Sequence, residues 1–417
     1  MKRPSAETLY YGLSFALRMP TWVVMAVYLV RTLHLSPLQL VLMGTAMEGA
    51  VFLFEVPTGV VADTYSRRLS LIVGYLGMGT ATVAVGLVST PGLVIVLWAL
   101  WGIAYTFTSG AEEAWVADEC GAERAGRIFL RAARFGQAGA VVGLLLQVAV
   151  GVASLRAGVV LGGAFTISCG LACIVLMEEH GFTRRPREER HSPFREMRTT
   201  AVAGARYARA APVIVLLVAV GVFGGMSSEG FDRLKEAHFL RDVGLPAVGH
   251  LSPVVWFGVF WLVGMAGGFA GTTFLIRRFE REGSETISAA LLACVVLELG
   301  AMVMFAVAWS AWAAIAALLG VFLARDLADP LYTIWLNEQI TDSSVRATVF
   351  SISGQADAIG QTAGGPVIGV IGNVWGIRAA LLAGATALAP AAALLARAIG
   401  KHHGAEPALE ELPEPTS

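Results

Sequence analysis

Several carboxyl side chains stand inside apolar runs of this sequence, where a charge is costly. Glu48 and Glu55 are seven residues apart, so on a helix they share one face, with Glu55 about 10 Å further along the axis. Asp357 lies in another apolar run, with Gln355 and Gln361 nearby. Burial away from water favours the neutral form of a carboxyl group. We therefore treat these three acids as proton-binding candidates, with a structural salt bridge as the alternative role.

A stretch with both signs of charge, SSEGFDRLKEAHFL (227–240), begins where another apolar run ends. Glu229 is a further proton-binding candidate there, and Asp232 and Arg233 are candidates for contact with a substrate. Neighbouring glycines at positions 224, 225 and 230 weaken a helix. We expect a break in the helix at this point that borders a cavity; the alternative is an ordinary polar helix end.

Other charges and rings inside the apolar runs complete the candidates for a substrate cavity. Arg18 is a predicted ion-pair partner of one of the two glutamates in the second run. Arg325 and Asp329 are four residues apart, so a helix pairs them and leaves Asp326 to point elsewhere. Glu298 lies in an apolar run without a predicted role. Three aromatic candidates are Tyr105, Trp256 and Trp335. Aromatic rings also anchor helices at membrane interfaces, which is the alternative for these three.

The composition shows which elements must position these residues. Of 417 residues, 56% are hydrophobic and only 15% are charged, and the mean hydropathy is +0.67. Apolar runs recur along the chain, each long enough to cross a hydrocarbon core of about 30 Å. The sequence predicts an all-α polytopic membrane protein with twelve transmembrane helices. They cover 10–31, 37–58, 69–89, 93–113, 130–153, 157–177, 211–230, 252–276, 286–308, 311–333, 346–372 and 378–398.

The basic residues predict the orientation of these helices. With the N-terminus placed in the cytoplasm, the inner segments hold 22 of the 30 Lys and Arg residues, and the outer loops hold 6. Cytoplasmic loops of membrane proteins carry the excess of Lys and Arg. Both termini are therefore predicted to be cytoplasmic. The Ala-, Gly- and Arg-rich composition, with three lysines, favours a bacterial cell membrane.

The chain divides into two similar halves. We expect a six-helix bundle over 1–177, a polar cytoplasmic linker over 178–205, a second six-helix bundle over 206–399 and a disordered tail over 400–417. The segment AWVADE (114–119) follows the fourth run, and the related IWLNEQ follows the tenth run, 220 residues later. The repeat favours two pseudo-symmetric bundles, an arrangement typical of transporters.

The turn after the second run, GVVADTYSRR (59–68), carries three charges between two apolar runs. It resembles the signature G-x-x-x-D-R-x-G-R-R/K between helices 2 and 3 of the major facilitator superfamily. The matching residues are Gly59, Asp63, Arg67 and Arg68. Thr64 stands where the family usually has arginine, and Ser66 where it usually has glycine. The resemblance covers the topology of the whole chain and the residues of this turn.

The resemblance implies a cytoplasmic gate. Asp63 would lie against the start of the helix 346–372, whose free N–H groups favour an anion. Arg67 or Arg68 would pair with carboxylates that follow the fourth run. Those available are Glu112, Glu113, Asp118 and Glu119. Arg134 shares a face with Arg127 and Arg131, and these three would pair with the same acidic end. Simple anchoring by positive charge explains the two arginines of the turn, but not its aspartate.

These features favour a secondary active transporter that rocks two halves about a central site. No GxxxxGK[ST] loop for ATP is present in the sequence. Among the functions of such a transporter, the sequence most favours proton-coupled efflux of an amphipathic drug or organic metabolite. The alternatives are a proton-coupled importer, and a flippase or uniporter of lipid-like substrates. The string GQTAGGPVIG (360–369) resembles an antiporter motif, although tight helix packing explains it equally well.

Other classes of protein find less support. An intramembrane enzyme would need a constellation such as H-E-x-x-H, yet the histidines lie in predicted loops, at span ends or in the tail. A receptor without transport would not explain carboxylates at midplane depth. We expect no cofactor, no metal and no nucleic acid. The expected partners are a small organic substrate, protons and the bilayer, and the expected state is a monomer.

Overall fold

The computed structural model describes residues 4–20, 22–182, 212–279, 284–340 and 346–405. The chain forms two compact units. Unit 1 comprises Met1–Arg198 with Ala247–Val259, and unit 2 comprises Thr199–Pro246 with Phe260–Ser417. Residues 183–205 of the predicted linker and 406–417 of the predicted tail lie outside the described residues. The predicted domain limits stay a prediction.

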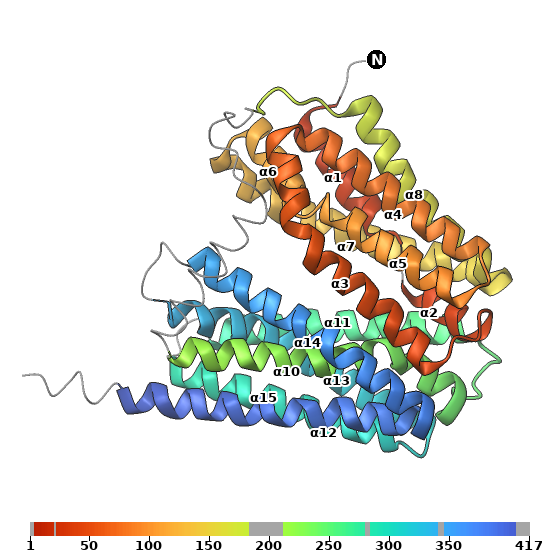
Figure 1. The fold of residues 1–417 in the computed structure, drawn as a ribbon, viewed down its shortest axis with the longest axis vertical. Helices are drawn as coiled ribbons and strands as arrows, with labels where there is room; N and C mark the ends of the chain where they lie inside the picture. Colours follow the sequence, from red (N-terminus) through yellow and green to blue (C-terminus); the bar gives the residue numbers. More distant parts are fainter. Residues whose placement is uncertain (1–3, 21, 183–211, 280–283, 341–345, 406–417) are drawn as a thin grey trace, which may run out of the picture. The chain divides into compact units, whose positions relative to one another are not determined.

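The described part of unit 1 forms six helical passes, and Figure 1 labels their helices. Its helices are α1 (Ala6–Leu17), α2 (Trp22–Arg31), α3 (Pro37–Thr64), α4 (Arg67–Leu87), α5 (Pro91–Thr106), α6 (Ala111–Cys120), α7 (Ala122–Ala153) and α8 (Leu155–Leu176). Polar caps start several of them: Ser36 and Gln39 form a reciprocal capping box at α3, with Pro37 in its first turn. Helix α4 packs against α8, α3 against α5, and α1 against α7.

The first predicted span, 10–31, is broken into α1 and α2, which corrects the prediction of one continuous helix. Pro20 follows α1 and cannot donate a backbone hydrogen bond. The Met19 carbonyl in the break accepts a hydrogen bond of 3.3 Å from the side-chain amide of Gln147 on α7. A Cβ on Gly143 would lie against the Met19 backbone. The glycine on α7 therefore lets that helix approach the backbone between α1 and α2 closely.

The described residues of unit 2 also form six helical passes. They are α10 (Pro212–His238) with a π-helical turn η2 (Phe239–Val243), α11 (Pro253–Phe279), α12 (Ser284–Val307), α13 (Ala311–Glu338), α14 (Arg346–Trp375) and α15 (Ile377–Ala405). The first residues of α11 group with unit 1. Helix α10 packs against α14 and α15, and α12 packs against α13 and α15. In both units the first pass packs on the fifth and the third on the sixth, as an internal repeat requires.

Helix α10 runs through its glycines without interruption to His238, so the predicted break near residues 224–230 is wrong. The glycines instead mark the surface on which α14 packs. A Cβ on Gly225 would lie against the Asp357 backbone, and one on Gly230 against Ile368. Gly360, in the glycine-rich string of α14, lies in the same way against the Val222 backbone. Small residues on both helices thus permit close contact, which offsets their weak helix propensity.

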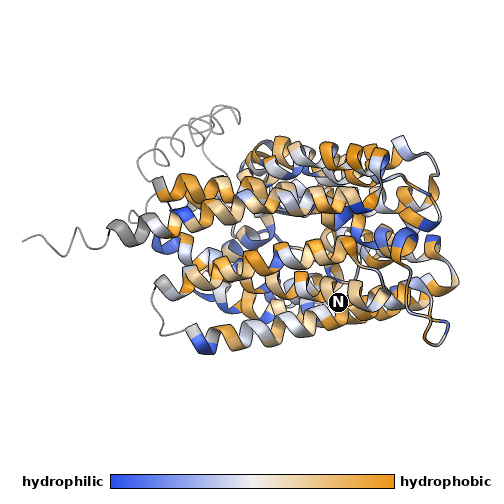
Figure 2. Cartoon of the chain, turned by 90° about the horizontal axis from the view of Figure 1, so that it is seen from below, coloured by the Kyte–Doolittle hydropathy of each residue, from blue (hydrophilic) through white to orange (hydrophobic). Residues whose placement is uncertain are grey.

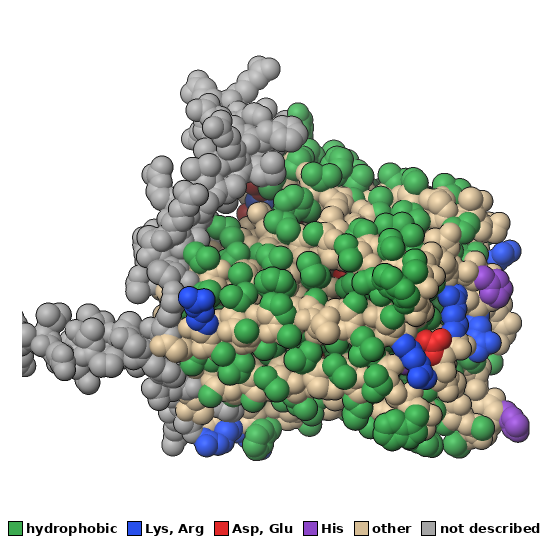
Figure 3. Space-filling view, turned by 60° about the horizontal axis from the view of Figure 1, so that its bottom comes forward, with side chains coloured by type: hydrophobic (Ala, Val, Ile, Leu, Met, Phe, Trp, Pro, Cys, Tyr) green, Lys and Arg blue, Asp and Glu red, His purple; other side chains and the backbone are tan. Residues whose placement is uncertain are grey.

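The helices are suited to a bilayer. Within the described residues, eleven helical segments are long and apolar enough to cross a membrane. Helix α14 is outside that group because Ser, Gln, Asp and Gly lower its hydropathy. Figure 2 shows hydrophobic residues along most of each helix. Figure 3 shows one face on which hydrophobic side chains predominate, with Lys, Arg and His near its edges. The chain is an all-helical polytopic membrane protein, as predicted; the cytoplasmic placement of its termini stays a prediction.

Candidate functional site

The signature turn between α3 and α4 places Arg67 between two carboxylates. Its Nη1 donates to Asp63 at 2.9 Å, one turn earlier, and its Nε donates to Asp118 of α6 at 2.6 Å. The guanidinium also lies over the Phe182 ring, 5.7 Å from its centroid. Asp118 is one of the four acids that the sequence offered. The contact of Asp63 with the start of α14 stays a prediction, and Gly59 lies one turn before Asp63 on α3.

A second arginine and a serine of the turn bind the segment that follows α8. We name residues 177–182 the strap. The Arg68 guanidinium donates to the Ile174 carbonyl at 2.7 Å, near the end of α8. The Glu179 carboxylate of the strap accepts from the Ser66 hydroxyl at 2.6 Å and from the Arg68 backbone N–H at 3.0 Å. Ser66 also caps α4 by accepting from the Leu69 N–H. The family's usual glycine at this position has no side chain for these contacts.

Other acids of α6 have partners different from those predicted. Glu119 accepts from the backbone N–H groups of His180 and Gly181 in the strap. Glu112 and Glu113 lie in the first turn of α6, away from the described ion pairs of Arg67. The sequence could not choose among these acids because all four lie within eight residues of one another.

The predicted group of arginines on α7 does not pair with the acidic end of α6 among the described ion pairs. Arg124 and Arg131 instead lie 3.5 Å and 3.6 Å from the Glu7 carboxylate of α1. Arg134 is exposed. Helix α7 packs along α1, so its basic face meets the acid in the first turn of that helix.

The two glutamates of α3 occupy different environments. Glu55 is exposed and accepts a hydrogen bond of 3.2 Å from the Ser109 hydroxyl, whereas Glu48 is half-buried. Arg18 is exposed at the end of α1, and it acts electrostatically on Glu112. Pairing of Arg18 with either glutamate of α3 stays a prediction. Tyr105 is exposed as well and belongs to an aromatic group described below.

Unit 2 contains an ion-pair network that joins three helices. Arg325 of α13 donates from Nε to Glu298 of α12 at 2.6 Å and from Nη1 to Asp232 of α10 at 2.9 Å. Its guanidinium also lies 5.1 Å from the centre of the Phe231 ring. The predicted pairing of Arg325 with Asp329 is therefore wrong, and Glu298 gains a role that sequence reasoning missed. The negative charge of Glu298 inside an apolar run was the available signal.

Glu229 and Arg233 pair within α10. The Arg233 Nε lies 3.1 Å from the Glu229 carboxylate, which is 2% exposed. Lys235 lies 3.6 Å from Asp232, so this acid has two basic neighbours. The charges of this stretch are therefore paired with one another and with Arg325.

Asp357 differs from these acids because its hydrogen bond comes from a neutral group: the Gln361 side-chain amide donates to its carboxylate at 2.6 Å. It lies where α14 meets Gly225 of α10. One turn earlier on α14, the Ser353 hydroxyl lies 2.7 Å from that of Tyr332 on α13. A polar seam therefore runs along α14 inside unit 2.

The remaining cavity candidates differ in exposure. Asp326 is exposed, and its carboxylate lies against Gly268 of α11. Trp256 is buried, and Trp335 is fully buried in the interior of unit 2. Both indoles are therefore largely covered by the rest of the protein.

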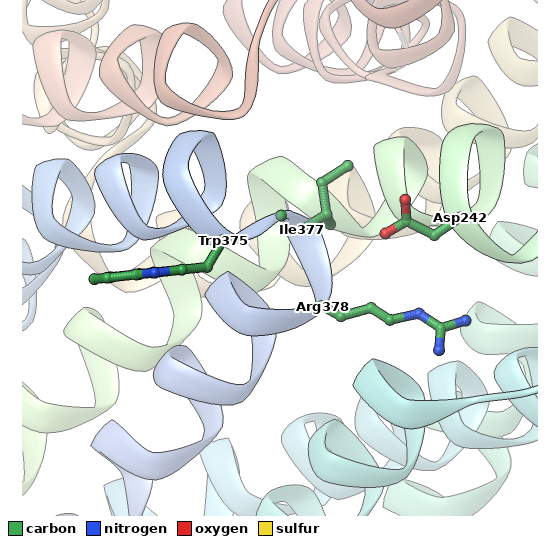
Figure 4. A pocket seen from close by; sticks show the side chains of 5 residues that line it. Asp242, Trp375, Ile377 and Arg378 are labelled. Carbon is green, nitrogen blue, oxygen red and sulfur yellow. The ribbon is translucent and has the colours of Figure 1, made fainter.

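A pocket of about 280 Å³ opens between η2 and the α14–α15 turn of unit 2 (Figure 4). Asp242, Trp375 and Arg378 line it with Gly376 and Ile377. His238 lies one helical turn before Asp242 and is fully buried. Its Nδ1 is 3.0 Å from the Asp242 carboxylate, and its Nε2 is 3.1 Å from the Phe305 carbonyl oxygen. Both partners are acceptors, so only a doubly protonated ring donates at both nitrogens.

Helices, the signature turn and the paired bundles agree with one family of proteins. The sequence profile of the Major Facilitator Superfamily matches residues 8–337. This chain belongs to the Major Facilitator Superfamily. It is accordingly a multi-pass membrane transporter of small molecules.

Known proteins resemble this superfamily member over most of its length. The uncharacterized MFS-type transporter YxaM of Bacillus subtilis (strain 168) is 22% identical over 379 residues, an alignment that covers 88% of each chain. A mutant of the nucleoside transporter NupG has a TM-score of 0.75 at 13% identity and covers 94% of this chain and 98% of that chain. An inward-facing bacterial homolog of the human lysosomal transporter Spinster has a TM-score of 0.70 at 17% identity, with 95% and 96% covered. At such identities these structures establish the shared fold.

Proposed function

We propose that this protein is a secondary active transporter that works by alternating access and exports an amphipathic organic molecule in exchange for protons. The observation that carries the proposal is the setting of Asp357. Among the described acids of unit 2, Glu229, Asp232, Glu236 and Glu298 lie beside basic side chains. A carboxylate beside a cation stays ionised. Asp357, held by the Gln361 amide within a membrane helix, is the acid of this unit best placed to take up and release a proton.

The surroundings of Asp357 support a link between its charge and the conformation of unit 2. Arg325 and Asp232 act on it electrostatically, so the ion-pair network and the proton site influence one another. The Asp357 backbone also lies against Gly225 on α10. A change of charge at this crossing would alter the contact between two tightly packed helices. Coupling of this kind is what exchange of a proton for a substrate requires.

The signature turn of unit 1 is the proposed gate. Arg67 bridges α3 and α6 through Asp63 and Asp118, and these partly exposed ion pairs, whose side chains are 18–32% exposed, can separate without leaving a fully buried charge. Ion pairs near the protein surface contribute little stability, about 0–1 kcal/mol each. Contacts of that strength suit a gate that must form and break in every transport cycle.

Everted membrane vesicles that carry this protein test the proposal. Respiration acidifies their lumen, a pH-sensitive dye reports the gradient, and lipophilic cations, tetracycline-like and macrolide-like compounds are added one at a time. We expect one compound to dissipate the gradient, and Asp357→Asn to abolish that response. Glu123→Gln, at an exposed acid in the first turn of α7, is the control and should respond like the wild type.

One result would overturn the proposal, and a second would show that a different residue carries the proton. If the protein moves a labelled amphiphile but no compound moves protons, exchange is wrong and the protein is a uniporter or flippase. If Asp357→Asn keeps the full response, proton exchange stands but Asp357 does not carry it. The half-buried Glu48 is then the next candidate.

A further inference from the structure

Four aromatic rings of unit 1 form a continuous group, which we name the aromatic ladder: Trp22, Trp98, Trp101 and Tyr105. Trp22 belongs to α2, and the other three recur on α5 at spacings of three and four residues, so they share one face. The Trp101 and Tyr105 rings are stacked, with centroids 5.6 Å apart and planes at 5°. Trp22 meets Trp98 edge-on at 5.1 Å. Trp98 is 5.6 Å from Trp101, which joins the four rings.

One ring of the ladder is buried and two are exposed. Trp98 is 2% exposed, while Trp22 is 47% exposed and Tyr105 is 41% exposed. Among the described residues the buried Trp98 indole N–H has no hydrogen-bond partner. An unsatisfied buried donor is uncommon, and a polar atom that enters beside the ladder would satisfy it. The ladder therefore offers open ring faces on a fixed base.

Carboxylates of α3 lie beside the open end of the ladder. Gly102 of α5 lies against the Met47 backbone, so α3 crosses α5 next to Trp101. Glu48 follows Met47 directly in the chain. Nearer the end of α5, the Ser109 hydroxyl donates to Glu55 at 3.2 Å, one turn after Tyr105.

Several carboxylates lie close enough to Tyr105 to act on its hydroxyl electrostatically: Glu55, Glu112, Glu48 and Glu113. Charged side chains are rarely found facing lipid, because lipid cannot solvate them. The open face of Tyr105 is therefore not merely a lipid-facing anchor of the helix. Its acidic neighbours would complement the charge of a bound cation.

We propose that the aromatic ladder and the two glutamates of α3 bind an aromatic organic cation. The faces of Trp and Tyr rings carry negative partial charge, so they attract cations and also stack against flat apolar rings. The carboxylates complement the positive charge and disfavour an anion of the same shape. This inference deepens the proposed function by naming its substrate class. Only the export of this cation depends on the proposed function, because binding itself needs no exchange of protons.

Binding to the purified full chain distinguishes charge from shape. Tetraphenylphosphonium and tetraphenylborate have nearly the same size and carry opposite charges, and equilibrium dialysis measures both. We expect saturable binding of tetraphenylphosphonium and at least about 10-fold weaker binding of tetraphenylborate. Glu55→Gln and Tyr105→Leu should each weaken tetraphenylphosphonium binding by about 3- to 10-fold. Tyr105→Phe keeps the ring and should bind nearly as the wild type does.

Controls separate the site from general effects. Trp309→Phe removes part of an indole that is 82% exposed in unit 2, and it should leave binding unchanged. Both tested side chains are exposed, so the variants should fold, and an unchanged elution volume and melting temperature verify this. The comparison of the two ions on the wild type needs no variant at all.

The possible results are distinct. Equal binding of the two ions, or no loss of binding in Glu55→Gln and Tyr105→Leu, would overturn the site. If tetraphenylphosphonium binds as expected but no compound moves protons in vesicles, the cation site stands and proton-coupled export fails. If vesicles show proton exchange only with compounds that do not compete with tetraphenylphosphonium, export stands and this substrate class is wrong.

Discussion

The ion-pair network of unit 2 yields a prediction whose size follows from its geometry. Arg325→Met leaves Glu298, which has an 11% exposed side chain, without its guanidinium partner at 2.6 Å. Removing one partner of a buried ion pair costs about 3–5 kcal/mol, because the remaining charge stays out of water. We expect about 3 kcal/mol, the lower end, since the Arg325 side chain is itself 24% exposed.

The second partner of Arg325 makes the prediction sharper. Asp232 keeps Lys235 at 3.6 Å after the arginine is removed, so Glu298 is the charge that is stranded. Adding Glu298→Leu to Arg325→Met should therefore recover about 1–2 kcal/mol. Glu298→Leu alone should cost less than Arg325→Met, because Arg325 retains Asp232 at 2.9 Å.

Unfolding in mixed micelles, followed by far-UV circular dichroism as the denaturing detergent increases, measures these differences. The Arg325→Met variant should unfold at the lowest detergent fraction, and the double variant should lie between it and the wild type. If Arg325→Met unfolds together with the wild type, the network does not stabilise unit 2. If the double variant is no more stable than Arg325→Met, the stranded glutamate is not the cause.

Three other contacts give outcomes that can be measured directly. Glu179→Ala should weaken the start of α4 by about 1 kcal/mol, seen as roughly 5-fold faster hydrogen exchange of the Arg68 and Leu69 amides. Glu178→Ala is its control, and equal exchange in both variants would refute the capping role of the strap. A double-mutant cycle with Asp118→Asn should give a coupling of about 1 kcal/mol between positions 67 and 118 when residue 67 is Arg. Arg67→Lys should remove most of that coupling, because one ammonium cannot hold both carboxylates as the guanidinium does. Full coupling in the lysine variant would contradict the bridging geometry. Gly143→Leu should prevent folding because its side chain would meet the Met19 backbone, whereas Gly126→Leu, with open space beside it, should fold. A Gly143→Leu protein with the elution volume and melting temperature of the wild type would show that the contact is not close.

The positions of the membrane helices could be predicted because they depend on local composition. Each predicted span corresponds to a helix or a pair of helices in the structure. Two regions differ from the prediction: the first span, which is broken, and α10, which is not. Proline and a close approach of α7 break the first span, while packing of α14 keeps α10 regular through its glycines.

The candidate site was predictable as a set of residues, but not as a set of partners. Motif spacing identified Asp63 and Arg67, and four nearby acids were equally good partners for the arginine. Folding brings α6 beside the turn so that Asp118 is the acid that Arg67 reaches. Spacing along α13 suggested Asp329 for Arg325, but neighbouring helices supply two other carboxylates.

The amino-acid sequence alone determined that this protein is a polytopic helical membrane protein, where its helices lie and which residues carry charge within them. Hydropathy over about 20 residues and short motifs are local properties, so no knowledge of packing is needed to read them. The tertiary structure alone decided which charges pair, which glycines become contacts and which rings stand open. These depend on residues far apart in the chain that meet only when helices pack, as Glu298 and Arg325 do across α12 and α13.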